Sequence, residues 1–150
     1  ALDRDRLSAM IAAVGRERLV LDLSCRRRDD DYFVVTDRWQ KFTDLRVTRQ
    51  TLESLAAECA EFLIHAVDVE GLCQGIDRTL VEMLGKCTPI PTTYAGGARS
   101  LEDLEVVTRA GRGRVDLTIG SALDIFGGSG VTYDEVVAFN HRAALPPSDA

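Results

Sequence analysis

The chain of 150 residues is 45% hydrophobic and 28% charged, which is the size and composition of one globular domain. Its net charge of −6 gives a nucleic-acid-binding surface no general electrostatic support. No apolar run approaches the roughly 20 residues that span a bilayer, and the pattern of a secretory signal is not visible. We therefore expect neither nucleic acid nor a membrane as a partner.

The spacing of the cysteines and histidines does not match a metal site. The four cysteines include no C-x-x-C pair, and the two histidines lie far apart in the chain. We expect no metal and no other cofactor, and we expect reduced thiols, which are typical of an intracellular protein. The expected location is the cytoplasm, or the plastid stroma if the parent is a plant or algal protein.

Short apolar runs alternate with amphipathic segments, a pattern typical of βα units on a parallel sheet. The first predicted elements are a helix over residues 3–14, a strand over 18–25, and a polar excursion over 26–44 with a possible hairpin arm at 32–35. They are followed by a helix over 48–60, a strand over 62–67, a helix over 76–84 that Gly85 would end, a strand from about 90, a helix from 100 to about 111, a strand over 115–119 and a last helix from 132. In the excursion, three arginines at 26–28 precede three aspartates at 29–31, and we interpret this run as a solvated loop.

A helix followed by four βα units predicts an α/β fold of an incomplete kind. Four units are half of an eight-stranded (β/α)8 TIM barrel, which usually takes about 250 residues. If helices cover only one face of such a sheet, the other face is apolar and exposed to water, which parallel sheets rarely tolerate. We therefore expect residues 1–145 to form a half-barrel and residues 146–150 a disordered tail. The inner face should need an N-terminal half-barrel or a second copy of the chain.

Glycines stand just beyond the third and fourth predicted strands. Residues 91–100 read PTTYAGGARS, with Gly96 and Gly97, and residues 115–123 read VDLTIGSAL, with Gly120 and Ser121. A glycine past a strand lets the backbone approach a ligand closely, and the N-terminus of a following helix favours an anion. Either turn alone could be a plain strand-to-helix connection. Two side by side, on what would be strands seven and eight of a barrel, predict a phosphate site.

Asp22 is the only charged residue of the run LVLDL at 19–23. Burying a carboxylate costs several kcal/mol unless it is paired or hydrogen-bonded, so its position in a strand calls for an explanation. It could cap a neighbouring loop. Because side chains near the carboxyl ends of barrel strands face the active site, it could instead be a general acid or base.

Three further side chains stand near predicted strand ends or in the excursion. Alternation places Asp68 on one face with Ile64 and Ala66, which favours Asp68 as a pocket residue. The same alternation places His65 on the opposite face, where we expect a hydrogen-bonded histidine between sheet and helix. Trp39, the only tryptophan, could be a core residue of the excursion or a lid that stacks on a heterocycle, and the sequence leaves both open.

Four segments together resemble one enzyme family. They read LDLSCR at 21–26, FLIHAVDVEGLC at 62–73, YAGGA at 94–98 and GSALDIFGG at 120–128. They are similar to phosphoribosylformimino-aminoimidazole carboxamide ribotide isomerase of histidine biosynthesis, in its fungal and plant form. The similarity runs from the first helix to about Asn140 and covers strands five to eight of that family's barrel.

The resemblance implies a cofactor-free Amadori rearrangement of an aminoaldose to an aminoketose, on a ribotide with a phosphate at each end. Asp22 would be the strand-five acid that protonates the ribose ring oxygen, and an acid on strand one, outside this sequence, would remove the C2 proton. Trp39 and Asp68 would contact the substrate, while residues 96, 97, 120 and 121 would hold one phosphate. Without the strand-one acid, the isolated chain should be nearly inactive.

Two alternatives remain open at this point. The related cyclase that forms imidazole glycerol phosphate shares the strand-five aspartate and the double phosphate sites, although the segments at 25–26 and 124–126 favour the isomerase. A non-catalytic phosphate-binding half-barrel that self-associates through its open face is the alternative from a different class.

Overall fold

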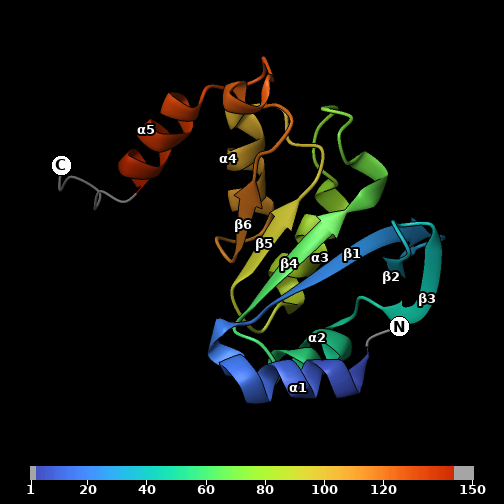
Figure 1. The fold of residues 1–150 in the computed structure, drawn as a ribbon. Helices are drawn as coiled ribbons and strands as arrows, with labels where there is room; N and C mark the ends of the chain where they lie inside the picture. Colours follow the sequence, from blue (N-terminus) through green and yellow to red (C-terminus); the bar gives the residue numbers. More distant parts are fainter. Residues whose placement is uncertain (1–2, 144–150) are drawn as a thin grey trace.

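Residues 3–143, which the computed structural model describes, form one six-stranded sheet with α-helices packed on one of its faces (Figure 1). The helices are α1 (Arg4–Val14), α2 (Arg49–Ala56), α3 (Arg78–Cys87), α4 (Leu101–Ala110) and α5 (Tyr133–Ala143), with short 3-10 turns η1 (Arg16–Arg18), η2 (Val67–Val69) and η3 (Asp124–Phe126). The strands are β1 (Val20–Arg28), β2 (Asp31–Thr36), β3 (Lys41–Arg46), β4 (Glu61–Ala66), β5 (Thr92–Ala95) and β6 (Val115–Thr118). The tail expected at 146–150 lies outside the described residues.

Four parallel strands, in the order β1-β4-β5-β6, form the larger part of the sheet, and β2 and β3 extend it antiparallel on the β1 side. Asp22 of β1 lies opposite Leu63 of β4, and Ala95 of β5 lies opposite Thr118 of β6. The carboxyl ends of the parallel strands therefore meet at one edge of the sheet. This confirms the predicted α/β fold with four sequential parallel strands.

The polar excursion is a strand-and-hairpin extension of the sheet, and the interpretation of the arginine run as a solvated loop is wrong. Residues 26–28 continue β1 and pair with residues 31–33 of β2. The arginines are accommodated there because each finds a partner. Arg26 Nε lies 2.7 Å from Asp68 Oδ1, and the Arg28 guanidinium lies 4.0 Å from the centre of the Phe33 ring.

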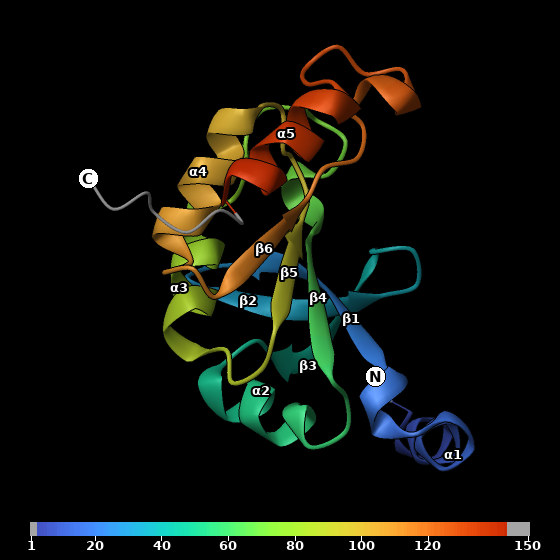
Figure 2. The same cartoon turned by 90° about the vertical axis from the view of Figure 1, so that its left-hand side faces the viewer.

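Alternation along the strands sends one set of side chains into the core. Leu23 of β1, Phe62 and Ile64 of β4, and Tyr94 of β5 are almost fully buried. Helices α2, α3 and α4 lie on this side of the sheet (Figure 2), and they bury leucine and valine side chains in the same cluster. Burial of a large apolar side chain contributes roughly 1.5–3 kcal/mol, so this face holds the chain together.

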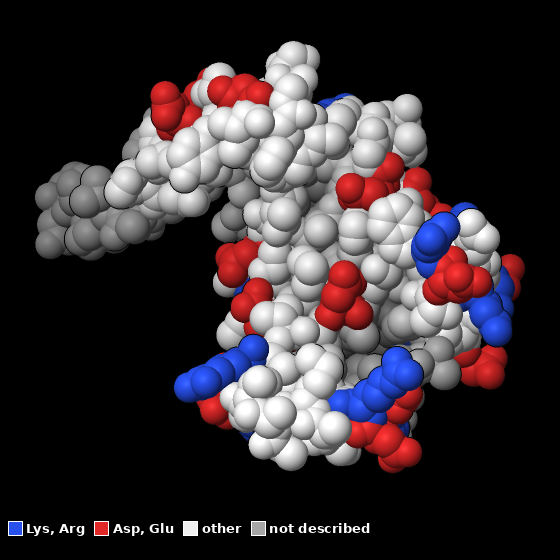
Figure 3. All heavy atoms as spheres, in the orientation of Figure 1, with Lys and Arg blue, Asp and Glu red and all other residues white. Residues whose placement is uncertain are grey.

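The opposite face of the parallel strands, called the open face below, is not covered by a helix of residues 3–143 (Figures 1 and 2). It carries the alternate side chains, including Val20, Asp22 and Ser24 of β1 and Leu63 and His65 of β4. Val20 is 52% exposed although it belongs to a strand. Figure 3 shows this face as largely uncharged, with acidic side chains rather than Lys or Arg over the middle of the strands. The predicted inner face is thus uncovered, but polar groups interrupt its apolar surface.

Asp77 ties three elements together at the start of α3. Its Oδ1 accepts a hydrogen bond from the backbone N–H of Leu80, and its Oδ2 accepts one from the hydroxyl of Tyr32 in β2 at 2.7 Å. Its own N–H donates to the hydroxyl of Tyr94 in β5 at 2.8 Å. Burial and the Asp77 carboxylate raise the pKa of the Tyr32 hydroxyl, which therefore stays a donor.

We expect Asp77→Ala to lower the free energy of unfolding by about 2–4 kcal/mol, because it removes a helix cap and leaves the Tyr32 hydroxyl without its hydrogen-bond acceptor. Urea unfolding followed by circular dichroism measures the change. Asp134→Ala, an exposed substitution in the first turn of α5, is the matched control and should change the stability by under about 1 kcal/mol. Equal effects of the two substitutions would show that the Asp77 network does not stabilise the fold.

The helix ends follow the sequence signals only in part. The serine and acid spacing at Ser100 and Asp103 is typical of a capping box, but the Ser100 side chain makes no cap hydrogen bond at α4, and Asp103 accepts from the Arg99 N–H instead. At α5, Thr132 and Glu135 form a complete capping box, in which each accepts from the other's backbone N–H, and these bonds lower the pKa of Glu135. Gly85 does not end a helix, as predicted, but lies inside α3. A Cβ there would come 2.7 Å from the backbone of Gly111, so the glycine is needed for close packing of α3 near the end of α4.

The four cysteines differ sharply in accessibility. Cys25, Cys59 and Cys87 are buried, and Cys73 is exposed. Burial raises the pKa of the Cys25 thiol from 9.0 to about 12, and it also raises the pKa values of Cys59 and Cys87. Because the thiolate is the reactive form, the three buried thiols should be inert in the folded chain.

We therefore expect a disulfide reagent at pH 8 to modify one thiol per folded chain, at Cys73, and the other three after addition of denaturant. Absorbance of the released thiolate counts the modified groups. The Cys73→Ser chain should lose the fast phase entirely. Two or more fast thiols in the folded chain would contradict the buried positions.

Candidate functional site

Asp22 lies on the open face of the sheet, in β1. Its side chain is exposed, and its Oδ1 accepts a hydrogen bond from the hydroxyl of Ser24 at 3.1 Å. Within residues 3–143 no loop amide donates to this carboxylate, so the structure does not support the expectation that Asp22 caps a neighbouring loop. The carboxylate is therefore available to a ligand on the open face.

Trp39 and His65 meet above the same face. Trp39 lies in the turn between β2 and β3, 40% exposed, and its ring contacts the His65 imidazole edge-on, with centroids 5.1 Å apart. His65 therefore points to the open face, and the prediction that it lies between sheet and helix is wrong. The error came from the choice of face, because Ile64 and Ala66, not His65, point into the helix-covered core. Trp39 is likewise not a core residue.

Asp68 lies in η2, directly after β4, at the carboxyl edge of the sheet. The alternation argument does not apply to it, because the strand ends at Ala66 and a 3-10 turn begins. Its Oδ1 accepts from Arg26 Nε at 2.7 Å, and its Oδ2 accepts from the Arg27 backbone N–H at 2.8 Å. Asp68 thus fastens the end of β1 to the loop after β4, and both carboxylate oxygens have partners within the chain.

The two glycine-bearing turns lie side by side at the carboxyl edge, as the adjacency of β5 and β6 requires. Gly96 and Gly97 have φ angles of 122° and 73°, which L side chains rarely adopt. A Cβ on Gly96 would come 2.7 Å from the carbonyl oxygen of Ala66, and one on Gly97 would come 2.2 Å from that of Gly75. Both positions therefore require glycine, and the turn packs tightly on the loops after β4 and before α3.

The second turn is open where the first is tight. A Cβ on Gly120 would meet no atom within 4 Å, and the neighbouring Ser121 is exposed, with its hydroxyl 3.3 Å from the Cys73 thiol. The backbone N–H groups of Gly97 and Ser121 donate no hydrogen bond within residues 3–143. Two unpaired amides and a hydroxyl at one edge are donors that an anion can accept from.

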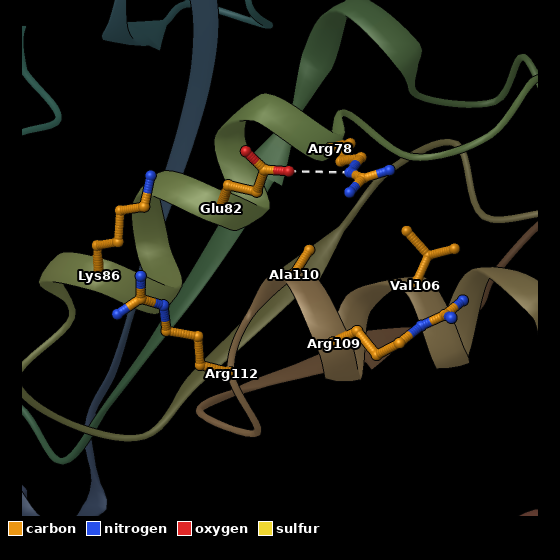
Figure 4. A pocket seen from close by; sticks show the side chains of 7 residues that line it. All are labelled: Arg78, Glu82, Lys86, Val106, Arg109, Ala110 and Arg112. Atoms are coloured by element: carbon orange, nitrogen blue, oxygen red, sulfur yellow. Dashed lines mark hydrogen bonds and ion pairs between the residues drawn. The ribbon is translucent and has the colours of Figure 1, made fainter.

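A cavity of about 400 Å³ lies away from these residues, between α3 and α4 on the helix-covered side of the molecule. Figure 4 shows its lining, in which Arg78 pairs with Glu82 and the side chains of Lys86, Arg109 and Arg112 stand apart from that pair. None of the site residues expected from the sequence lines this cavity. The candidate site is therefore the open face and its carboxyl edge.

Two further classes of feature were sought in residues 3–143. No group of three or more His, Cys, Asp or Glu side chains there is arranged to hold a metal ion. None of the helices in the same range combines the length and the apolar character that crossing a bilayer requires.

The sheet, its open face and the turns at the strand ends define an α/β domain that is consistent with the TIM-barrel class. Comparison with known proteins shows the family to which this domain belongs. The family described as "Histidine biosynthesis protein" matches residues 1–129. The chain is 52% identical over 141 residues to the chloroplastic 1-(5-phosphoribosyl)-5-((5-phosphoribosylamino)methylideneamino) imidazole-4-carboxamide isomerase of Medicago truncatula, covering 94% of this chain and 45% of that protein.

Fungal isomerases of the same name are also similar to the chain. Identity is 53% over 142 residues with that of Neurospora crassa, covering 93% of this chain and 55% of the relative, and 44% over 142 residues with that of Saccharomyces cerevisiae, covering 91% and 54%. The chain belongs to the histidine biosynthesis protein family, and its relatives are of the fungal and plant type that the sequence resembles. It spans about half the length of the curated relatives it matches.

Proposed function

We propose that this chain is the C-terminal half of a (β/α)8 barrel that isomerises a bis-phosphorylated ribotide by an Amadori rearrangement in histidine biosynthesis. The observation that carries the proposal is the uncovered open face, which holds Asp22 on the side where a barrel would have its interior. Four parallel strands with helices on one side are half of the strands and helices of an eight-stranded barrel. Relatives about twice as long bear the name of the isomerase.

In this function Asp22 is the general acid. Protonating the ribose ring oxygen lets the ring open to a Schiff base, and a base that removes the C2 proton converts the Schiff base to the enolamine. Loss of the proton of the C2 hydroxyl and protonation of C1 then give the aminoketose. The base is the strand-one acid of the N-terminal half. Because the two groups act on opposite sides of one substrate, the chain without its partner should be nearly inactive, by about 10²–10⁴-fold.

The carboxyl edge binds the substrate. Residues 96, 97, 120 and 121 hold one phosphate, through the unpaired amides of Gly97 and Ser121 and the Ser121 hydroxyl. Trp39 stacks on the substrate from the turn between β2 and β3. Asp68 contacts the substrate only where Arg26 and the Arg27 amide leave its carboxylate accessible, and its side chain is 38% exposed.

A second candidate function is a non-catalytic phosphate-binding half-barrel that pairs with its own copy. The observation that favours it is the exposure of Val20 beside Leu63 on the open face, because two copies could bury these side chains against each other. It predicts a dimer that binds a sugar phosphate without turnover. Light scattering after size-exclusion chromatography separates the two, since a stable monomer contradicts the dimer.

The assay that tests the proposed function gives the chain, mixed with the N-terminal half, two substrates in parallel. One is the aminoaldose ribotide of the isomerase, and the other is its ketose product with ammonia, which the related cyclase uses. We expect turnover of the first alone. Turnover of the second alone would make the chain half of a cyclase.

A further inference from the structure

His65 is placed like a ligand-binding side chain. It lies opposite Ser24 in the pairing of β1 with β4, and Ser24 in turn donates to Asp22. His65 is therefore one side-chain step nearer the carboxyl edge than Asp22, on the same open face, between the candidate acid and the glycine turns. Alternation alone predicted His65 on the other face, without a part in ligand binding.

The imidazole of His65 is held on two sides. Its Nε2 is buried and lies 2.8 Å from Glu70 Oε2, but the two atoms are not aligned as a hydrogen bond, so Nε2 has no hydrogen-bond partner within residues 3–143. The Trp39 ring covers the imidazole edge-on at an interplanar angle of 74°. The histidine side chain is only 18% exposed. With Nε2 at Glu70, the Nδ1 edge of the ring is left for a ligand.

The turn that brings Trp39 to His65 is itself strained. Asp37, Arg38 and Trp39 have φ angles of 52°, 53° and 69°, the left-handed region that few residues other than glycine adopt. Three such residues in succession are unusual, and strained backbone of this kind gathers at ligand sites.

We propose that His65 is a substrate-contacting residue of the candidate site, oriented by Glu70 and Trp39, and that its Nδ1 accepts a hydrogen bond from a sugar hydroxyl of the ribotide. The proposal rests on the proposed function for the identity of the ligand. A carboxylate beside Nε2 favours the tautomer that places the ring proton on that nitrogen, which leaves Nδ1 as the acceptor. Glu70 is then a positioning residue that acts through His65.

The first test uses the chain itself and nuclear magnetic resonance of its imidazole nitrogens. The chain has two histidines, so His141→Asn leaves His65 as the only signal. We expect the Nε2–H tautomer, loss of that preference in Glu70→Gln, and a saturable shift of Nδ1 when D-ribulose 5-phosphate is added. An Nδ1–H tautomer, or an Nδ1 signal that does not move with the sugar phosphate, overturns the proposal.

The second test uses the chain mixed with the N-terminal half. His65→Asn should raise KM by about 3–10-fold, the loss of one hydrogen bond, with a smaller change in kcat. Glu70→Gln should raise KM less. His141→Asn and Glu82→Gln, on α5 and α3, are the matched controls and should leave KM unchanged.

The two proposals fail separately. Absence of turnover by the unsubstituted mixture refutes the proposed function, and the resonance experiment then decides the role of His65 alone. Turnover by the mixture with KM equal in His65→Asn and His141→Asn refutes the role of His65 and leaves the isomerase standing.

Discussion

Asp22→Asn is expected to lower kcat of the chain mixed with its N-terminal half by about 10²–10⁴-fold, the usual effect of removing a general acid. Asparagine keeps the shape of the side chain and can still accept from Ser24, but it has no proton to give to the ribose ring oxygen. KM should change little, because the phosphate turns and Trp39 are untouched. Steady-state turnover of the aminoaldose ribotide measures both constants.

The matched control for this substitution is Asp116→Asn. Asp116 also alternates onto the open face, in β6, where it lies in the same row of the sheet as Asp22 but on the far edge strand, opposite Thr93 of β5. Its exposed carboxylate has no part in the proposed chemistry, so its loss should leave kcat unchanged. If Asp22→Asn and Asp116→Asn were equally active, Asp22 would not be the acid.

Gly97→Ala is expected to have the largest effect on folding. Forcing an L side chain to a φ of 73° costs about 1–2 kcal/mol, and relieving a contact 2.2 Å from the Gly75 carbonyl oxygen costs about 1–3 kcal/mol more. The sum of about 2–5 kcal/mol is a large part of the 5–15 kcal/mol that stabilises a typical domain. Urea unfolding measures this loss of stability. The substituted turn should also bind a phosphate group more weakly.

Gly113→Ala separates the two causes. Gly113 has a similar φ of 66°, but a Cβ there meets no atom within 4 Å. Its replacement should cost only the backbone part, about 1–2 kcal/mol. A Gly97→Ala chain as stable as Gly113→Ala would mean that the turn after β5 is looser than the structure describes. Gly120→Ala, which has open space and no positive φ, should fold normally and test the phosphate turn alone.

Much of the fold could be predicted because local patterns decide it. Alternating apolar runs and amphipathic segments indicated the four parallel strands, and the last helix was expected from residue 132, next to the observed start of α5 at Tyr133. The adjacency of the two glycine turns followed from the order of the strands. These features depend on short stretches of sequence, whose hydrogen bonds and burial are the same in many proteins.

The remainder depended on contacts between distant residues. The arginines at 26–28 look like a loop until Asp68 and Phe33 are placed beside them. His65 could be assigned to a face only by knowing which alternate positions of β4 the helices cover, and Phe62, Ile64 and Ala66 fill that side. The sequence signal that bears on the face of His65 is the set of apolar residues at alternate positions of the 62–67 run, which pack against helix α3.

The most direct measurement of the central claim is a titration of this chain with the N-terminal half of the barrel, followed by turnover of the aminoaldose ribotide. We expect almost no turnover by either half alone, and a rate that rises linearly and levels off at one N-terminal half per chain. The Asp22→Asn chain should form the same complex without the rate. A folded one-to-one complex that does not turn the ribotide over would contradict the assignment of this chain as half of an isomerase.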